Sequence, residues 1–190
     1  MNNILTINYR DRKVEINLWN NNYCLDRIDT EESLDIIQSI DAILKLNNLT
    51  LNSLDKIGFL SGPGSFTSAR VVAATCAGIQ TAFKSILIVP VLLNQAIHSL
   101  HDYASTDILL KCNNHTWHLY QDEKWLLLPN STVAQYLTKP YITPNEIPQG
   151  ISCQPALEWP DINLGLAKFT WSQLDQIDIN PYYGFEFPIN

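Results

Sequence analysis

The first half of the chain alternates between short apolar runs and one segment with helical periodicity. Two runs rich in β-branched and aromatic residues, Ile4–Asn8 and Val14–Trp19, flank a polar stretch, which predicts a β-hairpin. Asn20–Asn22 can form a second turn, so Tyr23–Asp29 is expected to return as a third strand. From Leu34 to Leu46 the apolar residues recur every three or four positions, which predicts an amphipathic helix.

A second helix is expected between two buried strands. Ile57–Leu60 is a short apolar run that ends in the glycine-rich loop Ser61–Ser65, and a helix is predicted from there to about Phe83. A further strand is predicted at Ile86–Val91. Three strands, helix, strand, helix and strand combine a meander with parallel crossovers, and this order predicts a layered α/β sheet.

The second half repeats this order of elements in a shorter form. It is expected to contain a connecting helix, three strands and another helix: Leu93–Tyr103, Asp107–Lys111, Thr116–Tyr120, Lys124–Leu128 and Ser131–Leu137. Residues 140–160 carry five of the ten prolines, which predicts a loop-rich stretch with a short strand at Tyr141–Thr143. Ile162–Trp171 can form a last helix, and Pro181–Pro188 an extended aromatic tail. We therefore expect an N-terminal lobe over residues 1–92 and a smaller C-terminal lobe over residues 93–190.

The composition fits a folded chain that does not bind nucleic acid strongly. Hydrophobic residues make up 46% and charged residues 16% of the 190 positions, as in ordinary globular proteins. The net charge of −7 repels phosphate backbones unless the cations gather on one face. Arg10, Arg12 and Lys13 form a local basic cluster, which a solvated hairpin turn explains better than an anion site.

The start of the sequence and the cysteines favour the cytoplasm and no membrane association. Met1–Leu5 lacks the features of a signal peptide, and no apolar stretch approaches the ~18 residues of a membrane span. The cysteines lack a Cys-x-x-Cys spacing and are expected to be reduced. Cys112, His115 and His118 could suggest zinc, but positions three apart on one strand point to opposite faces. We expect neither a metal nor a cofactor.

The loop Gly62-Pro63-Gly64-Ser65 is the most distinctive local feature. Two glycines around a proline directly after a strand allow a sharp turn of restricted shape. Ser65 stands where a helix N-cap is wanted, and the N–H groups there could also bind an anion or a carboxylate. The spacing does not fit a Walker A loop, a dinucleotide-binding fingerprint or a nucleophile elbow.

The helix after this loop has two kinds of surface. Val72, Cys76, Ile79 and Phe83 form an apolar face of core type, while Ala69, Ala73 and Ala77 lie four apart on another face. A row of alanines permits close approach of a second helix. That helix could be Leu34–Leu46 of the same chain or a helix of another chain, and the sequence leaves both open.

The strand followed by Gly62–Thr67, Arg70 and the alanine-rich segment Ala73–Thr75 resembles the TsaB family, also called YeaZ. The resemblance runs almost continuously from Ile36 to Val91, and Pro181–Tyr183 resembles the end of that family's sequences. It implies the two-lobed actin-like, ribonuclease-H-like α/β fold, here in a divergent form with an abbreviated second lobe. It also implies a subunit that is not itself an enzyme.

The resemblance further implies partners and an interface. A TsaB-like subunit pairs with TsaD, the threonylcarbamoyl transferase that modifies adenosine next to the anticodon of tRNA, and a third partner is the ATPase TsaE. A homodimer is conceivable for the chain alone. The interface would use the two N-lobe helices, here through Ile36, Ile40, Ile43, Ala69, Arg70, Ala73, Ala74 and Ala77. The loop residues that could contact an anion or a nucleotide are Gly62, Pro63, Gly64, Ser65 and Thr67.

The chain also departs from the family's pattern. Ile7-Asn8-Tyr9-Arg10 stands where the family usually has Ile-Asp-Thr-Ser, which weakens any nucleotide site. Two alternatives to a TsaB-like scaffold stay open. A degenerate actin-like ATPase would bind nucleotide between its lobes, and a self-associating structural protein would use the alanine-rich helix to pair with itself.

Overall fold

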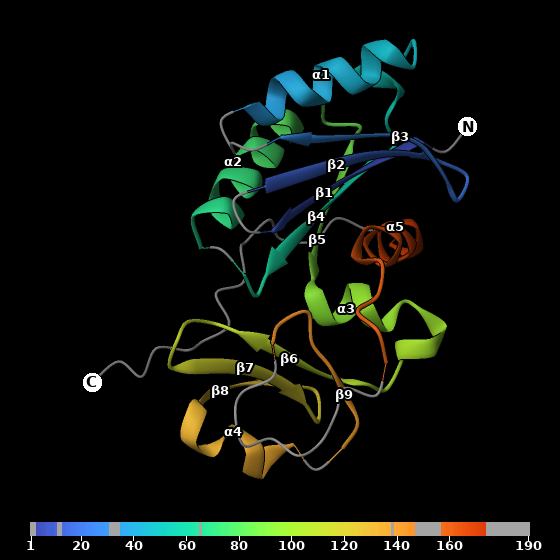
Figure 1. The fold of residues 1–190 in the computed structure, drawn as a ribbon. Coiled ribbons are helices and arrows are strands. Elements are labelled where there is room, and N and C mark those ends of the chain that lie inside the picture. Colours follow the sequence, from blue (N-terminus) through green and yellow to red (C-terminus); the bar gives the residue numbers. More distant parts are fainter. Residues whose placement is uncertain are drawn as a thin grey trace. The chain divides into compact units, whose positions relative to one another are not determined.

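The computed structural model describes residues 3–10, 13–30, 35–64, 66–137, 139–146 and 157–173. Its elements fall into two compact units (Figure 1). The first is built from the chain up to Leu100 together with the helix that begins at Ile162, and the second begins at His101 and ends at Asp161.

The first unit is a five-stranded mixed sheet with helices on both faces. Its strands, in the spatial order β3-β2-β1-β4-β5, are β1 (Asn3–Arg10), β2 (Lys13–Asn20), β3 (Tyr23–Thr30), β4 (Lys56–Gly62) and β5 (Leu87–Leu92). Strands β1, β2 and β3 form an antiparallel meander, while β4 is parallel to both β1 and β5. The helical elements of this unit are α1 (Ile36–Leu46), η2 (Leu51–Ser53), α2 (Phe66–Ala82), α3 (Leu93–His98) and α5 (Ile162–Ser172).

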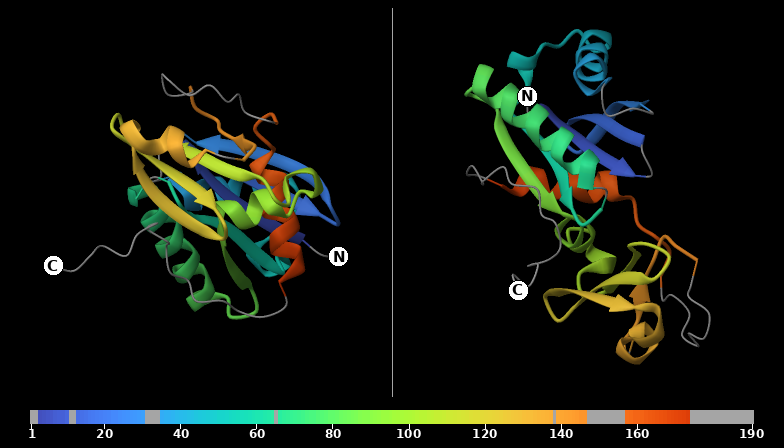
Figure 2. Two further views of the ribbon diagram at one scale, coloured as in Figure 1. Left: turned by 90° about the horizontal axis from the view of Figure 1, so that it is seen from below. Right: turned by 90° about the vertical axis from the view of Figure 1, so that its left-hand side faces the viewer.

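The central strand β1 is buried along nearly its whole length. The side chains of β1 from Asn3 to Tyr9 are all buried, because α1 and α2 lie on one face of the sheet and α5 and α3 on the other (Figure 2). On the α5 face, Ile4 and Trp19 pack against Ala167, and Trp171 packs edge-on against Trp19 with ring centroids 5.9 Å apart. Helices on both faces of a sheet leave its central strands without a solvent-exposed side.

The second unit is a four-stranded sheet with one helix packed on it. The order β8-β7-β6-β9 is formed by β6 (Asp107–Lys111), β7 (Thr116–Gln121), β8 (Lys124–Pro129) and β9 (Tyr141–Ile142), with η3 (His101–Tyr103) and α4 (Asn130–Tyr136). Its core contains Leu109, Trp117, Leu119, Leu128, Val133, Leu137 and Tyr141. Val133 and Leu137 are contributed by α4 and the turn after it, so this helix covers the face that these strand residues share.

The order of elements agrees with the sequence-based prediction, and one element is different. The single connecting helix expected over Leu93–Tyr103 is wrong: α3 ends at His98 and a separate 3-10 turn follows. The hydroxyl of Ser99 donates to the carbonyl of Gln95, and the Leu100 N–H donates to the Ile97 carbonyl, so the chain tightens and leaves the α-helical path.

The division of the chain also differs from the expected boundary after residue 92. The structure groups α3 and α5 with the first sheet, because α5 packs against β1, β4 and α3. The predicted tail Pro181–Pro188 lies outside the described residues. Among the described residues, no helix is long and apolar enough to cross a membrane.

Candidate functional site

The glycine-rich loop leaves the carboxyl end of β4 and leads into α2. Gly62 has a φ of 139°, a backbone conformation that side chains rarely tolerate, so glycine is required at this position. Pro63 is buried and Gly64 is exposed. Ser65, the predicted N-cap, lies outside the described residues, and α2 begins at Phe66. The loop is therefore shaped by its own backbone, as the sequence indicates.

The ring of Tyr9, near the end of β1, packs against the loop. A Cβ atom at Gly64 would lie 3.0 Å from Cε2 of the Tyr9 ring, so the loop backbone rests closely on the ring. Tyr9 is 4% exposed, and burial raises the pKa of its phenol. This contact involves the segment in which the sequence departs from the family's usual Ile-Asp-Thr-Ser. Sequence reasoning recorded the departure but not the burial of the ring.

Helix α2 has a buried face and an exposed face. Val72, Cys76 and Ile79 are buried toward β4 and β5, as predicted, whereas Phe83, the fourth predicted member of the core face, follows the end of the helix and is only half-buried. The opposite side is open, and Figure 2, right, shows no other element of the first unit over it. Its exposed residues are Thr67, Arg70, Ala74, Ala77, Gly78, Thr81 and Ala82, hereafter the outer face of α2. Apart from Arg70, these side chains are small.

The predicted alanine row does not lie on one surface. Ala69 and Ala73 are only 3% and 5% exposed, so they pack inside the first unit. Ala77 is exposed, as are Ala74 and Arg70. The intrachain explanation therefore accounts for Ala69 and Ala73, and an external partner can reach only the other three.

Helix α1 shows the same separation. Ile36, Ile40 and Ile43 are at most 2% exposed and pack inside the first unit, so they are not available to a partner. The surface of α1 instead carries Ile37, which is 54% exposed, and Leu46, which is 70% exposed. Asp41 and Lys45, one turn apart on the same side, form an exposed ion pair of 2.6 Å. Ile37 and Leu46 are nine residues, or two and a half turns, apart and lie on opposite sides of α1, so only one of them can belong to a given binding surface.

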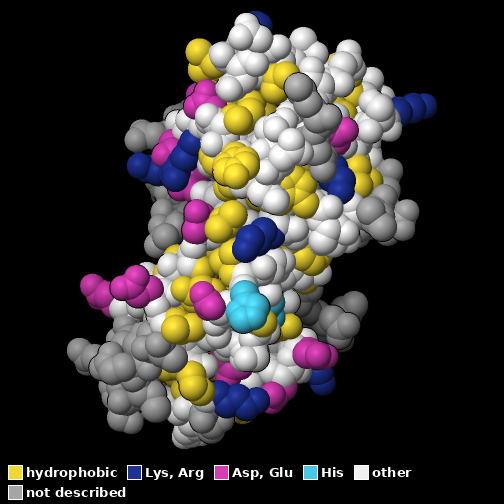
Figure 3. Space-filling model, turned by 90° about the vertical axis from the view of Figure 1, so that its right-hand side faces the viewer, with side chains coloured by type: hydrophobic (Ala, Val, Ile, Leu, Met, Phe, Trp, Pro, Cys, Tyr) yellow, Lys and Arg dark blue, Asp and Glu magenta, His cyan; other side chains and the backbone are white. Residues whose placement is uncertain are grey.

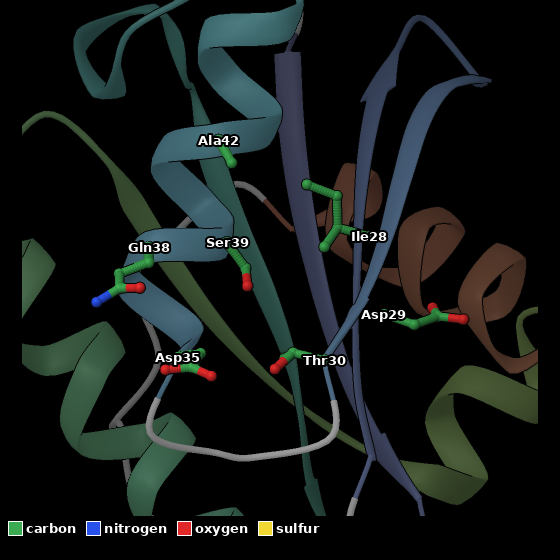
Figure 4. A pocket seen from close by; sticks show the side chains of 7 residues that line it. All are labelled: Ile28, Asp29, Thr30, Asp35, Gln38, Ser39 and Ala42. Atoms are coloured by element: carbon green, nitrogen blue, oxygen red, sulfur yellow. The ribbon is translucent and has the colours of Figure 1, made fainter.

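A small hollow lies between the end of β3 and the first half of α1 (Figure 4). Its volume is about 420 Å³, and it is lined by Ile28, Asp29, Thr30, Asp35, Gln38, Ser39 and Ala42. Thr30, Asp35 and Ser39 point toward the hollow, whereas Asp29 points away and pairs with Arg27 at 2.8 Å. This leaves one carboxylate and two hydroxyls, a set too small to define a metal or nucleotide site.

The histidines and cysteines of the second unit do not converge. Cys112 and His115 are exposed, while His118 is buried in β7, where desolvation lowers its pKa to about 4. His101 is exposed beside Asp102, with 3.6 Å between Nδ1 and Oδ1. His98, at the end of α3 in the first unit, is half-buried. Within the described ranges, no three His, Cys, Asp or Glu side chains are placed to hold a metal ion.

Comparison with known proteins now gives this arrangement a context. The family model described as "TsaD: tRNA N6-adenosine threonylcarbamoyltransferase" matches residues 30–100, which include α1, the loop and α2. No curated protein matches the sequence. An uncharacterized protein from Pseudomonas aeruginosa with similarity to peptidase YeaZ matches the structure with a TM-score of 0.67 and 16% identity, over 97% of this chain and 100% of its own. YeaZ from Pseudomonas aeruginosa matches with a TM-score of 0.63 and 18% identity, over 96% of this chain and 100% of its own.

The two structural matches show that the chain has a YeaZ-like fold. They confirm the predicted fold class, because the TsaB-like fold, a mixed α/β structure with two sheets, spans nearly the whole chain. The family model covers less than half of the chain, and it covers the part in which the loop and the outer face of α2 lie. The candidate functional site is therefore the exposed surface of α1 and α2 with the adjoining loop.

Proposed function

We propose that this chain is a non-catalytic scaffold subunit that binds a TsaD-type threonylcarbamoyl transferase. In this role it supports N6-threonylcarbamoyladenosine modification of tRNA in the cytoplasm, together with a TsaE-type ATPase. The family match over α1, the loop and α2 and the two YeaZ-like structures motivate the proposal. The interface consists of the outer face of α2 and the exposed residue Ile37 of α1.

The observation that carries the proposal is the small-residue outer face of α2. Gly78 lies within a 17-residue helix, and a Cβ atom built there would meet nothing within 4 Å. Glycine in a helix interior costs about 0.5–1 kcal/mol relative to alanine, and no contact with the described residues compensates for this cost. A partner helix that packs closely on Ala74, Ala77 and Gly78 supplies a reason for the small side chains.

The charge distribution fits a protein partner better than direct tRNA binding. On the face drawn in Figure 3, Lys and Arg side chains are scattered among acidic ones and form no single patch. The net charge of −7 adds to the repulsion of phosphate backbones. Recognition of tRNA is therefore assigned to the TsaD-type partner.

The decisive experiment is the affinity for a TsaD-type protein, measured by calorimetry on the full chain and on an Ala74→Arg variant. Ala74 lies at the centre of the outer face and is exposed, so arginine is expected to leave the fold intact. A bulky charge there should weaken the complex at least tenfold, or about 1.4 kcal/mol. Ala73→Arg would be uninformative, because Ala73 is 5% exposed and a buried charge would disturb the core.

A matched control is available in the second unit. Ala134 is an exposed helical alanine on α4, and Ala134→Arg should leave the affinity unchanged. A complex that tolerates Ala74→Arg would place the interface elsewhere. If no complex forms at micromolar concentrations, the proposal is wrong. In that case, tight ATP binding by the isolated chain would indicate the nucleotide-binding alternative, and a concentration-independent homodimer would indicate the self-associating one.

A further inference from the structure

Ser39 of α1 presents a hydroxyl to the hollow between β3 and α1. The residue is only 9% exposed, and its hydroxyl makes no hydrogen bond to the described residues. Its side chain points into the hollow (Figure 4). A buried hydroxyl without a partner opposes folding, and alanine would suit the helix better at this position. The hydroxyl is therefore satisfied only by what enters the hollow.

Asp35, the residue before α1, adds a carboxylate that does not cap the helix. It has a φ of −96° and a ψ of 9°, and its side chain makes no capping hydrogen bond. An aspartate that caps a helix has an extended backbone, and its carboxylate accepts from the first N–H groups. Here the carboxylate points into the hollow instead. Its full negative charge exceeds the positive charge of the helix dipole, which is about half a unit, so the hollow attracts cations.

The hollow has a polar end and an apolar end. Asp35 and Ser39 share the polar end with the hydroxyl of Thr30, which lies at the end of β3, whereas Ile28 and Ala42 line the other end (Figure 4). None of the seven lining residues is a lysine or an arginine. The volume of about 420 Å³ is in the range of small-molecule pockets. These walls complement a molecule with a cationic head and a short alkyl stem.

The hollow lies on the other side of α1 from the surface proposed for the TsaD-type partner. Asp35, Ser39 and Ala42 are spaced by four and three residues, so they share one stripe of the helix. Ile37 is two positions from both Asp35 and Ser39, which corresponds to about 200° around the helix. A ligand in the hollow therefore does not compete with a partner at Ile37.

We propose that this hollow binds an aliphatic cation, which is a guanidinium or ammonium group on an alkyl stem. The carboxylate of Asp35 and the hydroxyl oxygens of Thr30 and Ser39 accept hydrogen bonds from the head, and Ile28 and Ala42 pack against the stem. A guanidinium can form two parallel hydrogen bonds with a carboxylate, which favours it over an ammonium. The group belongs either to a free small molecule or to an arginine or lysine side chain of another protein.

The test is an NMR titration of the full chain, labelled with ¹⁵N, at constant ionic strength. The probes are n-butylguanidinium and n-butylammonium, and tetramethylammonium is the control because it has the charge but no N–H donor. The amide signals of Thr30, Ser39 and Ala42 should shift with the first two probes and saturate in the millimolar range. N-acetylarginine methylamide carries the same head on a peptide backbone. If it binds as well as n-butylguanidinium, the hollow accepts a protein side chain, and if only the free cation binds, the ligand is a small molecule.

Two variants separate binding from folding. Asp35→Asn keeps a residue that is favourable before a helix, removes the charge, and should weaken binding at least tenfold. Asp41→Asn is the matched control, since Asp41 is an exposed carboxylate of the same helix outside the hollow. Ser39→Ala should bind severalfold more weakly and yet be at least as stable without ligand. A natural chain that responds to neither probe, an equal response to tetramethylammonium, or an Asp35→Asn variant that binds fully would overturn the site.

Discussion

Two glycines in helices of the first unit, Gly165 in α5 and Gly78 in α2, have opposite surroundings. A Cβ atom at Gly165 would lie 2.2 Å from the carbonyl oxygen of Ala96 in α3, so the two helix backbones are in direct contact there. A Cβ atom at Gly78 would touch nothing within 4 Å. The chain itself therefore explains the first glycine and does not explain the second.

The same contrast extends to the rest of the two helices. Helix α5 is fixed by contacts inside its unit: Asn163 donates to Glu15 at 2.8 Å, and the ammonium of Lys56 donates to carbonyls at the carboxyl end of the helix. On the outer face of α2, Arg70 interacts with the chain, and Thr81 donates to the carbonyl of Ala77 in the same helix at 2.8 Å. The other side chains of this face are small. The polar contacts of α5 lie within the first unit, whereas the outer face of α2 remains exposed on it.

The largest expected effect is that of Gly165→Ala. A methyl group at 2.2 Å from a backbone oxygen cannot be accommodated unless α5 moves away from α3. Overpacking of this kind costs about 1–3 kcal/mol, and the backbone position of the obstacle favours the upper end of that range. Chemical denaturation should show the loss as a lower midpoint. An unchanged midpoint would mean that α5 does not pack on α3 as described.

The second prediction concerns the hydrogen bonds that Lys56 of β4 donates to the carboxyl end of α5. Lys56 donates to the carbonyl of Thr170 at 3.3 Å, to that of Trp171 at 3.0 Å and to that of Gln173. Lys56→Met keeps the apolar stem and removes the charged donor, so it should cost about 1–3 kcal/mol. Hydrogen exchange should increase in the last turn of α5. Lys84→Met, at an exposed position, is the control and should change stability little.

The sequence allowed the elements to be predicted but not which residues of the helices are free. Periodicity located α1 and α2 because it records burial, and for that reason Ile36, Ile40 and Ile43 belong to the interior and not to a partner surface. The place of α5 in the first unit depends on contacts such as Gly165 with Ala96, which are far apart in the sequence and leave no local pattern. The sequence did contain one signal for the outer face of α2: Gly78 lies one turn after Ala74, and glycine is unfavourable inside a helix unless something else requires it.

The smallest expected effect on stability, and the most informative one, is that of Gly78→Ala. The same substitution that destabilises α5 should stabilise α2 by about 0.5–1 kcal/mol, because alanine favours the helix and its methyl group meets nothing. Denaturation of the isolated chain measures this gain. The affinity of the Gly78→Ala variant for a TsaD-type protein should fall severalfold, because the added methyl group would lie at a close contact between helices. A variant that is more stable and binds equally well would show that Gly78 does not lie against the partner. A variant that is more stable and binds less well would show that the chain gives up stability at this position for the interface.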